Sequence, residues 1–256
     1  MHDVRDYLQT KGKLIVPIGT TEQHSTHLPF TTDTDIAVEV SVRAARKIGA
    51  LVAPPIHYGL SQDHAGFPGS AWLRPETLGR VIEDVSISYA MSGFKRIIWI
   101  NGHYGNQAAI QAFLMDMTGT SKIPEDTKVY GFSYWLTLPE ITAKSFLSSE
   151  AGWHANLGET SLMLAINPTA VKMENAPLEW PALVGKPDLV MDCVATGTGT
   201  WRYVCPKTGS WGDSKAATSE KGERLLDEIV TSVCKTIDQI ESALQEMQKV
   251  RDRPSA

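Results

Sequence analysis

Apolar positions follow two different spacings along the first half of the chain. Short continuous runs rich in Val, Ile and Leu have the length and composition of buried strands. Longer segments carry apolar residues at every third or fourth position, which is the spacing of one helix face. The short runs predict strands at Lys13–Ile18, Ala50–Pro54, Lys95–Ile100 and Lys128–Ser133, and the longer segments predict helices at Asp33–Gly49, Pro75–Gly93 and Gln107–Met117.

The alternation of strand and helix predicts an α/β fold with a mainly parallel β-sheet flanked by α-helices. Because the strands are apolar throughout, we expect the sheet to be buried on both faces. Thr160–Ile166, which Pro168 closes, has a pattern that suits either a helix or a strand. The sequence contains neither an internal repeat nor a linker, so residues 1–256 are expected to form a single domain.

The last third of the chain has a different character. Residues 168–214 are rich in Pro, Gly, Thr and Trp without a clear period, which predicts long loops with short irregular strands. We expect these loops to lie near the functional site or at a contact between subunits. Lys215–Val250 predicts a long helix with Leu226, Ile229 and Val233 on its apolar face. We expect this helix to pack on its own domain, with a subunit contact as the alternative.

Composition narrows the function classes. The composition of the 256 residues, 42% hydrophobic and 21% charged, is typical of a globular protein. The net charge of −5 does not indicate binding to nucleic acid. The three cysteines form neither a CxxC pair nor an even-numbered disulfide framework. No signal peptide and no run of roughly 20 apolar residues is present. We therefore expect a cytoplasmic protein with neither a nucleic-acid nor a membrane partner.

A first group of polar residues follows the first predicted strand. Glu22 and His24 are two positions apart, so in an extended segment they point the same way, about 6–7 Å apart. This spacing suits the ligands of two adjacent metal ions. Asp33 opens the next helix, where a carboxylate bridges two metals or simply caps the helix. His27 is also spaced from His24 as a ligand pair would be.

A second group of polar residues lies in the turn Asn101–Asn106, directly after the strand KRIIWI. Parallel strands end at one edge of a sheet, so His103 is expected beside the first group. Imidazole is a common metal ligand, although a histidine in a capped loop is the structural alternative. We interpret Asn106 as the N-cap of the following helix.

These residues belong to segments that resemble the creatininase (creatinine amidohydrolase) family. The resemblance implies a single three-layer α/β domain, a binuclear metal centre, a small-molecule substrate and a homo-oligomer, often a hexamer. It covers the chain from residue 14 to about 166. The matching segments are PIGTTEQHSTHLPFTTD (17–33), FPGSAWL (67–73), INGHYGN (100–106) and HANLGETS (154–161).

The resemblance also implies site roles. One metal would be held by Glu22, Asp33 and His103, and the other by His24, the bridging Asp33 and one further carboxylate. His154 matches the catalytic histidine, which transfers protons as a general acid or base.

The chain departs from the family pattern at two positions. Creatininases proper have a ligating glutamate where this chain has Gly105, and many members have glutamate where it has Leu157. Glu159 is expected to replace the missing ligand, with a helix N-terminal acid as the alternative. Both departures put creatinine itself in doubt as the substrate.

Four further residues are candidates for binding the substrate. Trp153 and Tyr104 flank the expected chemistry and would form walls for a flat molecule, unless they serve only as packing residues. Asp63 and His64, in the loop SQDHAGFPG, would contact the substrate, unless they only hydrogen-bond their own loop.

The sequence thus predicts a metal-dependent amidohydrolase that uses a metal-activated water to cleave a C–N bond, other than a peptide bond, in a small cyclic amide or formamide. Two divalent ions per chain are expected, with zinc first and manganese or iron(II) as alternatives. The competing functions are a peptidase, a hydrolase of a sugar-derived ring, and a non-catalytic binding or assembly protein.

Overall fold

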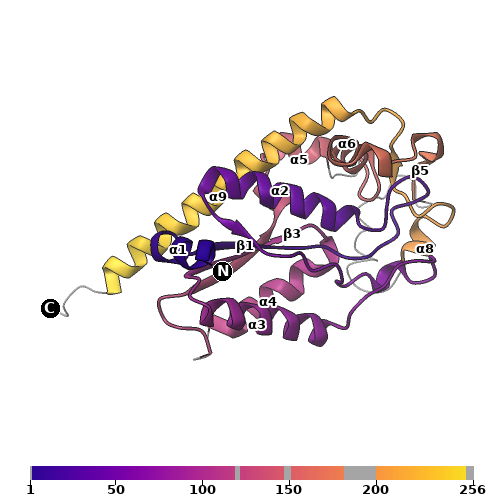
Figure 1. The fold of residues 1–256 in the computed structure, drawn as a ribbon. Coiled ribbons are helices and arrows are strands. Elements are labelled where there is room, and N and C mark those ends of the chain that lie inside the picture. Colours follow the sequence, from indigo (N-terminus) through magenta and orange to yellow (C-terminus); the bar gives the residue numbers. More distant parts are fainter. Residues whose placement is uncertain (1, 119–121, 147–150, 182–199, 252–256) are drawn as a thin grey trace.

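A four-stranded parallel sheet forms the centre of the molecule, in the strand order β2-β1-β3-β4. The computed structural model describes residues 2–118, 122–146, 151–181 and 200–251. Because every strand runs the same way, the carboxyl ends of the strands meet at one edge (Figure 1). The strands are β1 (Lys13–Ile18), β2 (Leu51–Val52), β3 (Arg96–Asn101) and β4 (Lys128–Ser133).

The predicted strands are confirmed, with one correction. β1 and β4 have the predicted bounds, and β3 is shifted by one residue. The predicted strand Ala50–Pro54 is reduced to two residues, β2, because Pro54 and Pro55 have no N–H to donate to a ladder. The result is the predicted α/β domain with a parallel sheet.

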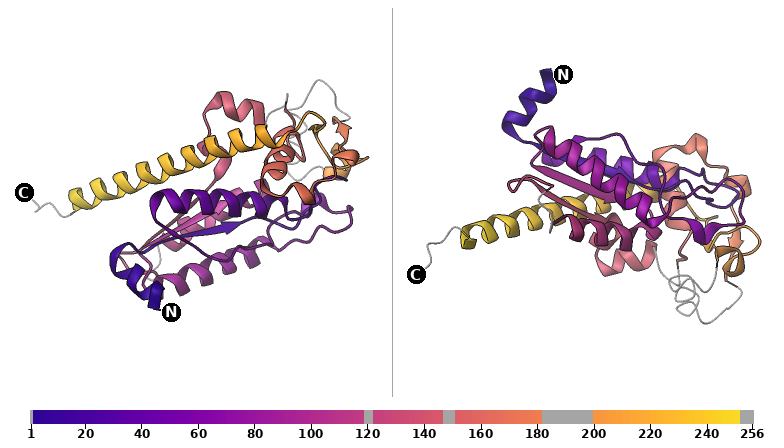
Figure 2. Two further views of the ribbon diagram at one scale, coloured as in Figure 1. Left: turned by 45° about the horizontal axis from the view of Figure 1, so that its top comes forward. Right: turned by 90° about the horizontal axis from the view of Figure 1, so that it is seen from below.

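Helices cover both faces of the sheet and make the three layers. On one face lie α2 (Thr32–Ile48), α6 (Leu157–Ile166) and α9 (Ser219–Arg251), packed on Ile15, Ile98 and Ile100. On the other face lie α3 (Pro75–Met91) and α4 (Gln107–Thr118), packed on the intervening side chains of the same strands. Figure 2 shows the two helical layers on either side of the strands. The expected burial of both faces of the sheet is confirmed.

Local capping explains where two helices begin. α6 resolves the ambiguous segment Thr160–Ile166 as a helix that begins three residues earlier, because the side chain of Asn156 accepts a hydrogen bond from the backbone N–H of Glu159. α9 begins at Ser219 rather than Lys215, because Thr218 Oγ1 accepts from the N–H of Lys221 at 3.2 Å.

Two helices outside residues 168–214 were absent from the sequence prediction, α1 (His2–Thr10) and α5 (Glu140–Phe146). α1 is short and mostly polar, and its three apolar residues, Val4, Tyr7 and Leu8, span little more than one turn, which is too short a pattern to predict a helix. The hydroxyl of its Tyr7 donates to the carbonyls of Lys13 and Gly49, at 2.7 and 3.0 Å. These bonds tie α1 to the start of β1 and the end of α2.

The first half of α9 packs on its own domain, as predicted, with Leu226, Ile229 and Val233 fully buried. The last turns project beyond the sheet toward the C-terminus (Figure 1), and residues 245–251 are exposed there. Among the described residues, no helix is both long and apolar enough to cross a membrane.

In the described part of residues 168–214 the elements are short, as predicted. The two-stranded antiparallel pair consists of β5 (Leu178–Glu179) and β6 (Gly212–Asp213), and α8 (Trp201–Val204) is a single turn. Residues 182–199 of this region lie outside the described residues. The remaining helix, α5 (Glu140–Phe146), precedes α6.

Two glycines bring the N-terminus of α2 against the ends of β1 and β3. A Cβ on Gly19 would lie 2.4 Å from the backbone N of Thr34, and a Cβ on Gly102 would lie 2.2 Å from the carbonyl O of Asp33. Both contacts are with backbone atoms, which cannot turn aside as a flexible side chain does. The absence of side chains at these two positions therefore allows Asp33 to reach the sheet edge.

Replacement of Gly102 by alanine tests this contact. The added Cβ forces α2 away from β3, so we expect Gly102→Ala to lower the free energy of unfolding by about 1–3 kcal/mol, measured by urea denaturation. An unchanged urea midpoint would show that the helix end is not held by this close approach.

Candidate metal centre and catalytic site

The predicted site residues meet at the carboxyl edge of the sheet. Glu22 and His24 follow β1, Asp33 lies in the first turn of α2, and His103 follows β3. Glu159 and His154 come from α6 and the loop before it. Each of the six residues is at most 8% exposed. The structure thus brings together residues that are up to 137 positions apart, from Glu22 to Glu159.

Asp33 is shared by two groups of candidate ligands. In one group, ligand atoms of Glu22, Asp33 and His103 lie within 4.8 Å of one another. In the other, atoms of His24, Asp33 and Glu159 do the same. Asp33 Oδ1 is 3.1 Å from His24 Nε2, and Oδ2 is 3.0 Å from His103 Nδ1. The two oxygens of one carboxylate therefore face two different groups, as in a bridging ligand.

Each of the two candidate ligand histidines has an inner ring nitrogen that faces the carboxylates and an outer one that faces away from them. The partner of the outer nitrogen shows which nitrogen is free to bind a cation. His24 Nδ1 lies 3.2 Å from the carbonyl O of Glu22, and His103 Nε2 lies 2.7 Å from that of Leu60. A carbonyl only accepts, so each of these nitrogens carries the proton. The inner nitrogens, which face the carboxylates, are therefore the ones that a cation would bind, and this is the arrangement that second-shell carbonyls impose on metal ligands.

Several inner atoms have no hydrogen-bond partner within the described part of the chain. They are buried, and an uncompensated buried polar atom is costly. Divalent cations with histidine and carboxylate ligands would satisfy them, so the residues present fit such a centre. The atoms are Glu22 Oε2, His24 Nε2 and Asp33 Oδ2.

Burial controls the protonation of the three carboxyl groups. It raises the pKa of Glu22 well above its usual value, with the charge of Asp33 adding to the effect, and it raises the pKa of Glu159 to about 7. Burial would raise the pKa of Asp33 too, but His24 and His103 hold it below its usual value. Positive charge at this site is therefore needed to keep all three groups ionised at neutral pH.

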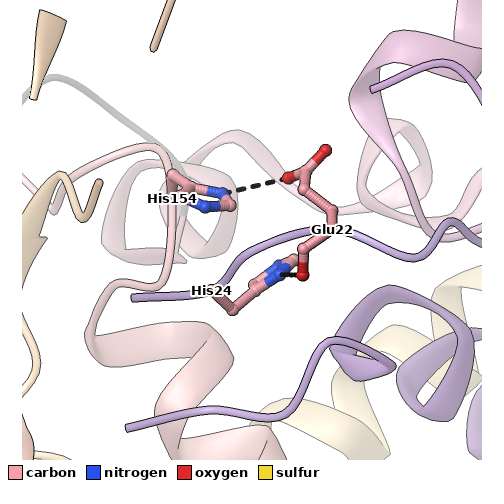
Figure 3. A group of neighbouring side chains, drawn as sticks. All are labelled: Glu22, His24 and His154. Atoms are coloured by element: carbon pink, nitrogen blue, oxygen red, sulfur yellow. Dashed lines mark hydrogen bonds and ion pairs between the residues drawn. The ribbon is translucent and has the colours of Figure 1, made fainter. Parts of the chain in front are cut away.

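His154 lies at the margin of this cluster. Its Nε2 is 2.8 Å from the carbonyl O of Gln23, and its Nδ1 is 3.5 Å from Glu22 Oε1. Figure 3 shows the imidazole pointing at the Glu22 carboxylate, with His24 beside it. Burial is the main cause that lowers the pKa of His154 well below its usual value, and the neighbouring imidazoles of His24 and His64 add to the effect because a second charge beside either ring is unfavourable. The ring is therefore neutral at pH 7, with an unprotonated nitrogen on the side of Glu22.

Glu159 combines the two roles considered from the sequence. Its Oε2 accepts from the backbone N–H of Ala155 at 2.6 Å, which is the contact of a helix N-terminal acid. Its carboxylate also belongs to the group with His24 and Asp33. At Gly105, a Cβ would lie 2.1 Å from the carbonyl O of Leu60, so a glutamate there would displace that loop. The backbone around Gly105 thus excludes the usual ligand, while Glu159 lies within reach.

The four predicted substrate-binding residues line one cavity together with the ligand groups. Tyr104 is half exposed, Trp153 packs against an aromatic cluster, and Asp63 and His64 belong to the short helix Gln62–His64. His64 is buried, with Nε2 3.3 Å from Glu22 Oε1. The cavity walls also include Tyr134, Trp135 and Trp201.

Tyr134, Trp135, Trp201 and Gln23 lie at the site but were not among the predicted site residues. Trp201 of α8 stacks on His64, with ring centroids 5.0 Å apart and planes at 19°. It comes from the irregular region, where no periodicity indicates an inward side chain; the prediction that this region lies near the site is nevertheless confirmed. Gln23 contacts both His64 and His154. The only feature of the sequence that could have indicated its place at the site is its position between Glu22 and His24.

Two minor interpretations are settled by side-chain contacts. Asn106 is not an N-cap: its Oδ1 accepts from Leu60 N at 2.8 Å and its Nδ2 donates to the carbonyl of Gly19 at 3.0 Å. The amide is used to join the loops after β1 and β2 instead. Among the described residues, His27 belongs to none of the candidate ligand groups, and its Nε2 is hydrogen-bonded to Thr160 Oγ1 of α6 at 2.8 Å.

Several proteins of known name align with most of this chain. A creatinine amidohydrolase from Pseudomonas putida is 31% identical over 239 residues, covering 88% of each chain. A mycofactocin precursor peptide peptidase from Mycolicibacterium smegmatis is 28% identical, covering 85% of this chain and 81% of the relative. A 3-dehydro-scyllo-inosose hydrolase from Thermotoga maritima is 26% identical, covering 68% of this chain and 56% of the relative.

Solved structures of creatininases have the same fold. A crystal structure of creatinine amidohydrolase (creatininase) aligns with a TM-score of 0.75 at 26% identity, over 93% of this chain and 94% of that chain. Similar structures include one named creatininase Mn, with a TM-score of 0.74 at 26% identity, and a mutant named as a Zn-Zn type, with a TM-score of 0.73 at 27% identity. They cover 93% and 92% of this chain, respectively, and 95% of their own.

The family model described as creatinine amidohydrolase matches residues 1–237, which includes every candidate ligand and the aromatic walls of the cavity. With that match, the relatives and the shared fold, the chain belongs to the creatininase family of hydrolases.

Proposed function

We propose that this protein is a metal-dependent amidohydrolase that cleaves a C–N bond in a small cyclic amide or formamide. The observation that carries the proposal is the shared position of Asp33, whose two oxygens face two separate groups of buried ligands. Membership of a hydrolase family supports the reaction class. The names of the relatives extend from a creatinine amidohydrolase to a peptidase and an inosose hydrolase, so the substrate is argued from the cavity.

Two divalent ions are expected to be held by five side chains. Glu22, Asp33 and His103 would bind one, and His24, Asp33 and Glu159 the other. Ions bound there supply a Lewis acid that polarises a carbonyl and makes a water molecule more acidic. Zinc is our first choice, and the structures named as Zn and Mn forms support divalent ions of this kind. Iron(II) remains an alternative, since these ligands do not discriminate strongly.

His154 would move the proton in this reaction. Its Nε2 hydrogen-bonds the Gln23 carbonyl, so its Nδ1 carries the lone pair on the side of Glu22. That nitrogen takes a proton from the attacking water as a general base and delivers it to the departing nitrogen as a general acid. An amide nitrogen is a poor leaving group without this proton.

The cavity lining favours a flat molecule without negative charge. Aromatic side chains of Tyr104, Trp135, Trp153 and Trp201 surround the ligand groups. Four carboxylates line it, from Glu22, Asp33, Asp63 and Glu159, and their four negative charges equal the four positive charges of two divalent ions. No lysine or arginine occurs among the described residues that line it, so an anionic substrate would find no fixed counter-charge there.

Three other functions remain as competing hypotheses: a peptidase, a sugar-ring hydrolase and a non-catalytic binding protein. The first two have relatives of that name at 28% and 26% identity. The third is disfavoured because Glu22, Asp33 and His103 are all retained in one buried group. The homo-hexamer and the cytoplasmic location stay predictions.

The bridging role of Asp33 predicts the metal content of variants. Wild type should bind about two equivalents per chain, Asp33→Ala few or none because both groups lose a ligand, and Glu159→Ala about one, measured by elemental analysis. Asp35→Ala, which removes a carboxylate two positions further along the same helix turn, is the matched control and should bind as wild type. Full metal content in Asp33→Ala would refute a shared ligand.

Proton transfer by His154 predicts a loss of turnover without loss of metal. His154→Gln should retain both equivalents of metal and lose roughly 10²–10⁴-fold in kcat. His57→Gln, at an exposed histidine that does not line the cavity, is the control and should keep its activity. Unchanged kcat in His154→Gln would remove this residue from the chemistry.

A substrate panel distinguishes the proposed function from its competitors. The zinc-loaded and manganese-loaded proteins are assayed with lactams, cyclic ureides including creatinine, formamides, a short unmodified peptide and a cyclic polyol ketone. We expect turnover among the cyclic amides or formamides. Cleavage of the peptide or the ketone alone would favour the corresponding relative's chemistry, and binding without turnover of any compound would favour a binding protein.

A further inference from the structure

Gln23 is a buried amide that lies between two histidines of the cavity. It is 4% exposed, and its Nε2 is 2.8 Å from His64 Nδ1 and 3.1 Å from His154 Nε2. The same nitrogen donates to the carbonyl of Gly209 at 3.2 Å. Gln23 is not one of the candidate metal ligands, and its side chain carries no charge. Its burial between two histidines therefore needs another explanation.

The orientation of this amide follows from two backbone partners whose roles are unambiguous. Gln23 Oε1 accepts from the N–H of Ser25 at 2.8 Å, and Nε2 faces the carbonyl of Gly209. A backbone N–H can only donate and a carbonyl can only accept. Exchanging the amide oxygen and nitrogen would oppose both contacts, so the NH₂ group must be the part that faces the histidines.

This orientation determines which nitrogen of His64 carries its proton. Because Gln23 donates to Nδ1, that nitrogen holds a lone pair and the proton lies on Nε2. Nε2 is 3.3 Å from Glu22 Oε1 and 3.7 Å from Asp63 Oδ2, both longer than a good N–H···O bond. The N–H therefore lies beside the ligand groups, in a ring that lines the cavity.

His154 is the same tautomer, but Gln23 faces its other ring nitrogen, so His154 presents a lone pair to the site where His64 presents an N–H. The Nε2 of His154 is 2.8 Å from the main-chain carbonyl of Gln23, closer than the amide nitrogen at 3.1 Å, so Nε2 carries the proton. The two amide hydrogens of Gln23 then go to His64 Nδ1 and the Gly209 carbonyl, so each of these two hydrogens has an acceptor. The Nδ1 lone pair of His154 is left on the side of Glu22.

A second layer of contacts holds Gln23 in this orientation. Gly209 has φ +72°, and a Cβ there would lie 2.6 Å from both amide atoms of Gln23, so only glycine allows the approach. The preceding residues are fixed by the buried carboxylate of Glu179, which accepts from the N–H groups of Lys207 and Thr208 at 2.9 and 2.7 Å. Trp201 donates its indole N–H to the same Gly209 carbonyl and stacks on His64.

We propose that Gln23 is a positioning residue that assigns opposite tasks to the two histidines. It leaves His154 with a free Nδ1 that accepts a proton, and it gives His64 an N–H at Nε2 that donates a hydrogen bond to the substrate oxygen on which negative charge develops. His64 also forms a candidate ligand group with Glu22 and Asp63, but a ring with its proton on Nε2 has no lone pair to offer there, so His64 is a neutral donor rather than a metal ligand. His24 and His103 differ, because their outer nitrogens face carbonyls. The catalytic part of this proposal rests on the proposed amidohydrolase function, whereas the assignment of the protons does not.

The proton positions are measured directly by ¹⁵N NMR of the histidine rings in the zinc-loaded protein. In wild type we expect His64 and His154 both to be Nε2–H tautomers. In Gln23→Glu an oxygen replaces the donor, so His64 should shift to the Nδ1–H tautomer while His154 keeps its proton on Nε2. Gln62→Glu, the same substitution at an exposed glutamine of the neighbouring loop, is the control and should change neither ring.

Activity on the best substrate of the panel tests the donor role separately. Gln23→Glu and His64→Leu should keep two equivalents of metal and lose about 100-fold in kcat with little change in KM. His64→Gln, which retains an N–H donor, should recover at least one-tenth of the wild-type kcat. Equal losses in His64→Leu and His64→Gln would reject the donor role.

The wild-type spectrum needs no variant to decide the assignment. A proton on Nδ1 of His64 in wild type, or an unchanged His64 tautomer in folded Gln23→Glu, would overturn the role of Gln23. Absence of metal binding or turnover in wild type would instead overturn the proposed function, and the tautomers would still be measurable in the metal-free protein.

Discussion

The structure depends on burying three carboxylates, those of Glu22, Asp33 and Glu159, within one cavity. Like charges at this separation in a medium of low polarity oppose one another strongly, and burial alone favours their neutral forms. The arrangement is stable with all three ionised only if positive charge lies among them. Two divalent ions held by these carboxylates and by His24 and His103 meet that requirement and supply the chemistry of a hydrolase.

The fold satisfies this constraint by bringing backbone elements unusually close. Gly19 and Gly102 let the first turn of α2 touch the ends of β1 and β3, which carries Asp33 to the point between the two ligand groups. Backbone carbonyls of Glu22 and Leu60 hold the outer nitrogens of the histidines. The edge of the sheet and these backbone contacts therefore fix the positions of the ligand atoms, which leaves their side chains little freedom to move.

One wall of the cavity, at Trp201, comes from a less regular part of the chain. α8 and the loop Lys207–Gly209 place Trp201 and a carbonyl against His64 and Gln23. The β5–β6 pair and the Glu179 carboxylate anchor that loop. The candidate ligands lie after strands β1 and β3 and in the first turns of α2 and α6, whereas Trp201 comes from this loop region, in a family whose named relatives act on different compounds. Such a division allows the cavity shape to change without disturbing the metal ligands.

The amino-acid sequence alone determined the parallel sheet, because continuous apolar runs at Lys13–Ile18 and Lys128–Ser133 are local signals of buried strands. The spacing of Glu22, His24 and Asp33, together with a family resemblance, was enough to nominate the candidate ligands. The tertiary structure decided the rest: the short β2, the side-chain bonds of Asn106, and the contacts of Trp201 and Gln23. These depend on residues far apart in the chain, such as Gln23 and His154, 131 positions apart, and contacts at that separation leave no periodic trace in the sequence.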